Sequence, residues 1–187
     1  SAFGLITSAF LLLSGDESAY LAAQKQPMKL AAMEGLYKGE KNAGLVAAGI
    51  LNPAKKLGDE SDAFLLEIKV PYALGIMANR ELDSFTPGIN DLLYGNSEHN
   101  LISVEEKMAK GKVAIEALKN YKEAKKANDE SLMKSSLSNL ESNLNFLGYG
   151  YLKDAKDAVP PVALTFYSFH IMVALGTYFI ALFAITL

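Results

Sequence analysis

The chain has 187 residues, 50% of them hydrophobic, and a formal net charge of −3. Its length suits one medium-sized domain, and basic residues spread among acidic ones give no footprint for nucleic acid. The absence of cysteine excludes disulfides, thiolate catalysis and cysteine-based metal clusters. The hydrophobic residues gather at the two ends, whereas nearly all charges lie between Asp16 and Asp157.

The N-terminal apolar stretch runs from Phe3 to Leu13 and is roughly half as long as a helix that crosses a bilayer. It has no initiator Met, no basic segment before it and no small-residue cleavage pattern, so it does not fit a signal peptide. We therefore expect residues 1–14 to be the end of a transmembrane helix, and the numbering to start inside a larger protein.

Two groups of polar residues follow this stretch. Asp16 and Tyr20 are four residues apart, so on a helix they share one face, where a carboxylate and a phenol could hold a ligand hydroxyl. They could instead be interfacial residues that end a membrane helix. Lys29 and Glu34 are five apart, about 140° around a helix, and so would flank something instead of pairing. The alternative is a solvated Lys and Glu on an amphipathic turn.

The next segments are expected to be short. Residues Gly39 to Gly58, with four glycines and one proline, predict an irregular connection. The alternation from Phe64 to Val70 predicts a strand or an extended piece. A helix is predicted from Pro71 to Phe85, because the residue before a proline avoids the helical region and Pro87 follows. This helix carries one arginine, Arg80.

Two amphipathic, antiparallel helices are predicted in the second half of the polar region. Ser103 and Glu106 form the pattern of a capping box at the start of the first, and a turn is expected at Asn128 and Asp129. Gly148 is the expected stop of the second. Apolar residues recur at helical spacing in both: Val104, Met108, Ile115 and Leu118, then Met133, Leu137, Leu140, Leu144 and Leu147.

The C-terminal stretch from Val162 to Leu187 contains no Asp, Glu, Lys or Arg. As a helix its twenty-six residues would extend roughly 39 Å, which is enough to cross a bilayer core. Pro160 and Pro161 suit the start of such a helix. We expect residues 161–187 to be a transmembrane helix, the alternative being a buried helix of a soluble protein. The polar region between the ends would then lie on one side of the membrane.

His170 and Met172 lie within this C-terminal helix. Because they are two residues apart they point to nearly opposite sides, so at most one can face a given bound group. A buried methionine is ordinarily a packing residue, whereas an ionisable residue inside a membrane is a functional candidate. Their spacing alone does not decide between them.

Several motifs in order carry a resemblance to a known family. They are GDES, KLAAME, PYALGI with a downstream arginine, LGYG, and a proline-preceded apolar helix with IMVALG. The chain resembles the long form of the quinol-binding loop, or Q-loop, of cytochrome bd quinol oxidase subunit I, most strongly at Gly15–Glu34, Pro71–Arg80 and Ile171–Gly176. The expected fold is mainly α. It has an extramembrane Q-loop domain at 15–160 that contains the amphipathic helix pair, flanked by the partial transmembrane helix and the full one.

The resemblance implies a quinol:oxygen oxidoreductase. Electrons from ubiquinol or menaquinol would pass through a low-spin haem b to a di-haem centre, with a further haem b and a haem d elsewhere in the parent subunit, where dioxygen is reduced. The implied location is the bacterial inner membrane, with the loop on the periplasmic side and with lipid and subunit II as partners. By itself this polypeptide is expected to be inactive.

The resemblance also implies roles for particular residues. Lys29 and Glu34 would take part in quinol oxidation, with Glu34 as proton acceptor, since a carboxylate can accept the acidic proton of a quinol that loses electrons. Asp16, Tyr20 and Arg80 would lie around the quinol head group. In the last helix, Met172 would be the axial ligand of the low-spin haem b. His170 would lie close to this haem, at a position where the family commonly has arginine.

A second hypothesis is a non-enzymatic extracytoplasmic module, such as the sensor or interaction domain of a membrane protein. It explains the amphipathic helix pair equally well. It does not explain why Lys, Glu, Asp and Arg recur at the motif positions of the family.

Overall fold

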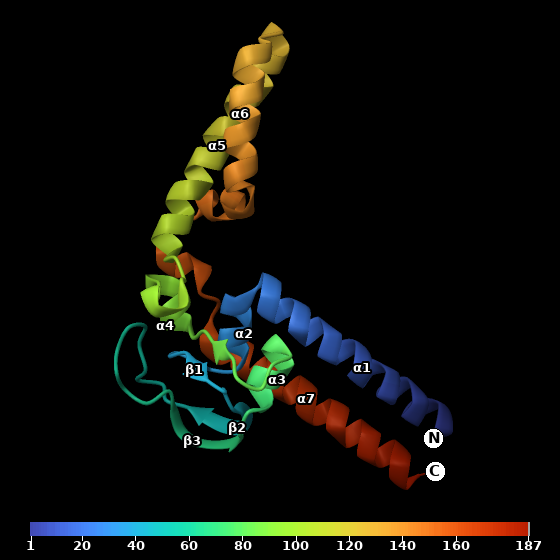
Figure 1. The fold of residues 1–187 in the computed structure, drawn as a ribbon. Coiled ribbons are helices and arrows are strands. Elements are labelled where there is room, and N and C mark those ends of the chain that lie inside the picture. Colours follow the sequence, from blue (N-terminus) through green and yellow to red (C-terminus); the bar gives the residue numbers. More distant parts are fainter. Residues whose placement is uncertain (187) are drawn as a thin grey trace. The chain divides into compact units, whose positions relative to one another are not determined.

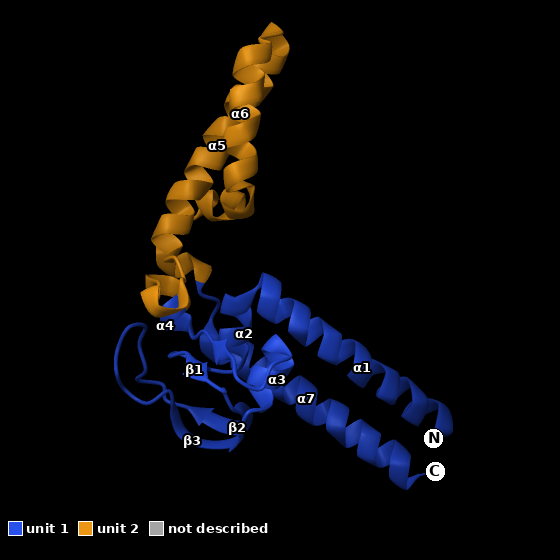
Figure 2. Cartoon of the chain, in the orientation of Figure 1, with its two compact units in different colours: residues 1–91, 159–187 blue, residues 92–158 orange. Residues whose placement is uncertain are grey.

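The structure is a computed structural model that describes residues 1–186. The chain forms two compact units, shown in different colours in Figure 2. The first contains residues 1–91 and the residues from 159 onward, and the second contains residues 92–158. Helices make up most of both units, so the mainly-α prediction is confirmed.

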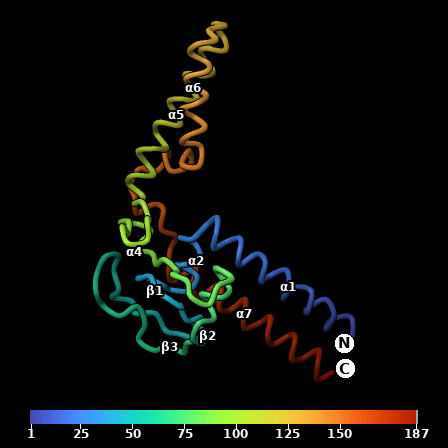
Figure 3. Tube along the Cα trace, in the orientation of Figure 1, coloured from blue at the N-terminus to red at the C-terminus, as the bar shows by residue number. Residues whose placement is uncertain are grey.

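Two long helices belong to the first unit: α1 (Ala2–Lys25) and α7 (Val162–Ile185). They run side by side, and the Cα trace in Figure 3 places the start of α1 beside the end of α7. Their approach is close at Gly4, where an added Cβ would lie 2.9 Å from the ring of Phe183. The apolar N-terminal stretch is therefore part of a longer helix that continues through Gly15.

The helix that includes α7 is, among residues 1–186, the one long and apolar enough to cross a membrane by length and composition. Its most apolar window has a mean hydropathy of 1.9 and no buried residue. Pro161 stands at its N-cap, as the sequence predicts. The predicted limits at residues 14 and 160 depend on where lipid begins, and they stay predictions.

Short elements connect the two long helices of the first unit (Figure 1). They are α2 (Pro27–Met33), β1 (Glu40–Lys41), β2 (Leu45–Leu51), β3 (Phe64–Val70), α3 (Ala73–Asn79) and β4 (Phe85–Thr86), with α4 (Ile89–Tyr94) at the boundary of the units. β1 pairs with β4, and β2 pairs antiparallel with β3. The register of the β2–β3 hairpin runs from Leu45 opposite Val70 to Leu51 opposite Phe64.

Three predictions can be compared with these elements. The strand predicted at Phe64–Val70 is confirmed as β3. The irregular connection predicted for 39–58 is wrong in part, because its apolar run pairs with β3 and forms β2 despite its glycine. The predicted helix from Pro71 is shorter than expected. It ends at Asn79, because Arg80 adopts a left-handed conformation with φ of 59°.

The core of the first unit joins the hairpin to the first turns of α7. Phe166 is 1% exposed and packs with Val46 and Leu51. Its ring centroid lies 5.5 Å from that of Phe64. The backbone N–H of Leu51 donates to the hydroxyl of Tyr167 at 3.1 Å. Burial of these side chains, worth about 2 kcal/mol for each large one, therefore fixes β2 against α7.

The second unit contains the predicted helix pair, α5 (Val104–Ala127) and α6 (Glu130–Asn143). Ser103 Oγ accepts from Glu106 N at 3.1 Å, as the capping pattern predicts, and Asp129 caps α6 through Leu132 N at 2.9 Å. Three 3₁₀ segments complete this unit: η1 (Ser97–His99), η2 (Leu144–Tyr151) and η3 (Ala155–Ala158).

The predicted helix stop at Gly148 is wrong. The α-helix ends at Asn143, and the chain continues through Gly148 as the 3₁₀ segment η2. This tighter winding brings Gly150 against Gly111 of α5, so closely that a Cβ on either residue would clash with the backbone of the other. Packing of η2 on α5 thus overrides a local stop signal.

Candidate functional site

Glu34 is the most deeply buried carboxylate of the described chain, with 2% of its surface exposed. It follows the last residue of α2, where its N–H continues the helix by donating to Leu30 O at 3.1 Å. Because α2 buries the face that carries Leu30 and Ala31, Glu34 lies on the same inward side one turn later. Its Oε2 accepts a hydrogen bond from Val46 N at 3.3 Å.

This burial changes the acidity of Glu34. Its pKa is raised to about 7, because removal from water disfavours the charged form. The Val46 N–H and the nearby His170 favour the charged form, but their effect on the pKa is smaller. A carboxyl group with a pKa near 7 can both take up and release a proton at physiological pH. The environment of Glu34 therefore suits a proton acceptor.

His170 lies on the other side of Val46. Its Nε2 is 2.8 Å from Val46 O, and its Nδ1 is 2.9 Å from Phe166 O one turn earlier in α7. The imidazole also packs on the ring of Phe166, with 4.0 Å between centroids. Val46 thus contacts Glu34 through its N–H and His170 through its C=O.

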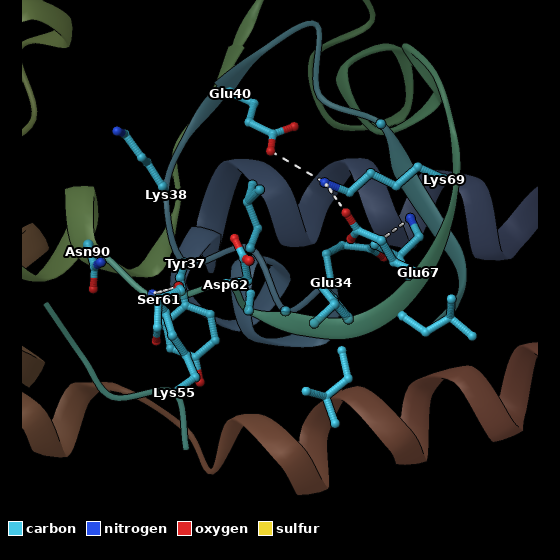
Figure 4. Close-up of a pocket in the computed structure, with 18 of the residues that line it drawn as sticks. Glu34, Tyr37, Lys38, Glu40, Lys55, Ser61, Asp62, Glu67, Lys69 and Asn90 are labelled. Carbon is cyan, nitrogen blue, oxygen red and sulfur yellow. Dashed lines mark hydrogen bonds and ion pairs between the residues drawn. The ribbon is translucent and has the colours of Figure 1, made fainter. Parts of the chain in front are cut away.

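A pocket of about 460 Å³ opens beside Glu34 (Figure 4). Its walls come from the segment after α2, from β2 and β3, and from the loop between these strands. Lys69 lies 3.4 Å from Glu40 and 3.5 Å from Glu67, so it links two carboxylates in the pocket wall. These side chains make the pocket wall beside Glu34 charged and polar.

Asp16, Tyr20 and Arg80 form a second cluster, between α1 and the end of α3. Arg80 pairs with Asp16 through both guanidinium nitrogens, at 2.6 and 3.1 Å, and lies 5.3 Å from the centroid of the Tyr20 ring. The hydrogen bonds that Arg80 donates to Asp16 raise the pKa of Arg80, so the arginine stays charged. The structure therefore brings these three predicted residues together.

Lys29 is not brought together with Glu34. It is exposed on α2, whereas Glu34 is buried, and Lys29 is not among the residues that line the pocket. The five-residue spacing has this effect, because α2 turns only one of the two positions inward. The predicted catalytic pair is thus one buried acid and one cation at the surface.

Met172 and His170 point to opposite sides of α7, as their spacing predicts. His170 bonds to β2, whereas Met172 is 61% exposed. The thioether is therefore open to a group beside α7, and this fits an axial ligand of a haem. Within residues 1–186, no three His, Asp or Glu side chains lie close enough to hold a metal ion.

Sequence reasoning missed Val46, Phe166 and the pocket. Val46 was missed because its segment was read as irregular. The signal that could have found it is the run LVAAGIL, whose length and apolar character suit a short buried strand. No local signal marks the pocket, because its walls come from segments far apart in the chain.

The fold and the site define a class of protein: a mostly helical body joined to an apolar helix, with a buried acid of near-neutral pKa beside that helix. The model of the family "Cytochrome bd terminal oxidase subunit I" matches residues 1–187. The chain belongs to this family, so the resemblance seen in the sequence motifs is confirmed.

Two relatives agree with this assignment. The chain is 31% identical to cytochrome bd-II ubiquinol oxidase subunit 1 of Escherichia coli (strain K12), over 95% of this chain and 34% of the relative. It is 34% identical to a putative cytochrome bd menaquinol oxidase subunit I of Bacillus subtilis (strain 168), over 46% of this chain and 18% of the relative. The chain thus spans about a third of the length of the first relative.

Proposed function

We propose that this chain is the quinol-binding and quinol-oxidising Q-loop part of a bd-type terminal oxidase, a quinol:oxygen oxidoreductase. The observation that carries the proposal is Glu34, a buried carboxyl group with a pKa of about 7 next to helix α7. The names of the two relatives specify ubiquinol and menaquinol, so a quinol is the substrate class that they support.

Glu34 is the proton acceptor in this proposal. A quinol becomes a strong acid as it loses electrons, so a carboxylate that takes the hydroxyl proton lowers the barrier to oxidation. The low-dielectric surroundings of Glu34 keep its pKa high enough to hold that proton at neutral pH. The proton then leaves through the adjoining pocket, whose wall carries Lys69, Glu40 and Glu67.

Asp16, Tyr20 and Arg80 bind the quinol head group. They offer a carboxylate acceptor, a phenol and a guanidinium donor on neighbouring turns of α1 and α3. Glu34 bonds to Val46 whereas Arg80 bonds to Asp16, so we assign this cluster to binding and orientation. Lys29 supplies a further cation on α2 that stabilises negative charge on the quinol oxygen.

Met172 would hold the low-spin haem b in the parent protein through its thioether sulfur. Met172 is 61% exposed, whereas His170 bonds to β2. When bound, this haem accepts electrons from the quinol one at a time. A further haem b and a haem d, and the surface for subunit II, belong to other parts of the oxidase.

The polar region 15–160 lies on the periplasmic side of the bacterial inner membrane, with lipid around the apolar part of α7. The exposed apolar surface of α7 supports the membrane location. The side of the membrane rests on the family resemblance.

The experiment for this function uses the complete oxidase that contains this chain. Ubiquinol or menaquinol is added without oxygen while haem absorbance is recorded. Reduction of the low-spin haem is expected. The second candidate, a sensor or interaction module, predicts no absorbance change with either quinol, and that result would overturn the proposal.

The Asp16–Arg80 cluster gives a prediction about binding. We expect Arg80→Gln to raise the KM for quinol about tenfold with a smaller change in kcat, because one charge-assisted hydrogen bond to the head group is lost. Asp83→Asn is the matched control, since it breaks the exposed Lys41–Asp83 ion pair of 2.9 Å outside the cluster. Steady-state quinol oxidation gives KM and kcat for both variants. A KM of Arg80→Gln equal to that of Asp83→Asn would remove Arg80 from the binding site.

A further inference from the structure

The two backbone groups of Val46 bond to two different side chains. Its N–H donates to Glu34, and its C=O accepts from the ring of His170. The pairing of β2 with β3 shifts register between Val46 and Ala48. Val46 lies opposite Lys69 at the edge of this irregularity, and both of its backbone groups have side-chain partners.

The imidazole of His170 is held firmly in place. Phe166, which is 1% exposed, packs on its ring, and the Phe166 carbonyl oxygen lies 2.9 Å from Nδ1. The position of Nε2 is thus set by helix α7 itself. Because Nε2 bonds to Val46 O, helix α7 also sets the orientation of the Val46 residue.

We infer that His170 is a positioning residue for quinol oxidation, which holds Val46 so that its N–H is directed at the carboxylate of Glu34. This inference rests on the proposed role of Glu34 as proton acceptor. It gives His170 a function on the proton side of the reaction, through the β2 backbone and independent of any haem.

The direction of the effect follows from what surrounds Glu34. The Val46 N–H and His170 both favour the charged form, against the larger effect of burial. The other titratable groups that line the same pocket are Tyr37, Lys38, Glu40, Lys55, Asp59, Glu60, Asp62, Glu67 and Lys69. These stay in place when His170 changes. Loss of the His170–Val46 bond therefore raises the pKa of Glu34, and less carboxylate is present at neutral pH to accept a proton.

Two uncharged substitutions distinguish the roles of the two ring nitrogens of His170. In His170→Gln the amide nitrogen can take the place of Nε2 and still donate to Val46 O. In His170→Asn it can take only the place of Nδ1, so Val46 O loses its partner. The control is Tyr167→Phe, which removes the other hydrogen bond between α7 and β2, the one from Leu51 N.

The measurement is the rate of quinol oxidation by the complete oxidase between pH 5 and 10, from which the pH of half-maximal rate is read. We expect His170→Asn to raise this pH by about one unit, and the rate at pH 7 to fall about fivefold and recover at high pH. His170→Gln should shift it by less, because it keeps the bond to Val46 O and loses only the direct electrostatic effect of His170 on Glu34, and Tyr167→Phe should leave it unchanged.

An unshifted Asn variant, or equal shifts for Asn and Gln, would overturn the inference. Any effect of His170 on a haem is separated by measuring reduction with an artificial electron donor, which bypasses Glu34. The proposed function fails by a different result, namely a Glu34→Gln variant that oxidises quinol normally. If Glu34→Gln is impaired and the Asn variant is not, only the positioning role is wrong.

Discussion

Replacing Glu34 with Gln lowers the rate of quinol oxidation by the complete oxidase by about a hundredfold or more, the usual contribution of a positioned base. Glutamine keeps the shape of the side chain and can still accept from Val46 N, but it cannot take up a proton. Artificial electron donors should reduce the haems of the variant at the normal rate, because they release no proton at this site.

Glu67→Gln is the matched control for this result. It removes a carboxylate from the wall of the same pocket, where Glu67 pairs with Lys69 at 3.5 Å, and it leaves Glu34 unchanged. We expect its rate to stay within a few-fold of the unsubstituted enzyme. Normal quinol turnover in Glu34→Gln would remove Glu34 from the mechanism.

The same carboxyl group fixes the pH dependence. The deprotonated form of Glu34 is the one that accepts a proton, and its pKa is raised to about 7. The rate should therefore increase as pH rises through about 7, and this increase should be absent from the residual activity of Glu34→Gln. The free energy of unfolding depends on pH in the opposite direction. The folded chain holds the proton of Glu34 more tightly than the unfolded chain does. The contribution of Glu34 to the free energy of unfolding therefore decreases as pH rises from about 4.5 to about 7.

Met172→Leu is expected to abolish the absorbance bands of the low-spin haem b in the complete oxidase, while the other haems keep theirs. Leucine conserves the apolar volume, so packing changes little, but it has no lone pair for an axial bond. Met77→Leu is the control, because it makes the same substitution on α3 in the described chain.

Reduced-minus-oxidised difference spectra and total haem content measure the outcome for both methionine variants. A low-spin haem with unchanged bands and unchanged midpoint potential in Met172→Leu would show that the ligand is another residue. Met172 is 61% exposed, so Met172→Leu removes little packing within the described chain.

Glu34 and Arg80 show how far local patterns reach. The motifs that carry the family resemblance identify both residues without any structure. However, the motifs do not show which partner each one has. Arg80 pairs with Asp16 across 64 residues of sequence, because the left-handed turn at the end of α3 directs it toward α1. The five-residue spacing of Lys29 and Glu34 likewise did not reveal that one is exposed and the other buried.

Local sequence patterns specify the features that depend on neighbouring residues. These are the uncharged run that forms α7, the caps that begin α5 and α6, and the alternation of β3. Each arises from periodicity, capping or composition within about twenty-five residues, so no distant contact is needed to specify it.

The environment of Glu34, in contrast, depends on contacts between distant segments. Its hydrogen bond comes from Val46, 12 residues away, and Val46 in turn bonds to His170, 124 residues away. The pKa of a carboxyl group depends on how much water is removed around it, and several separate segments must pack together to remove that water. The acidity of this residue is therefore a property of the folded chain, because no local stretch of sequence contains the groups that set it.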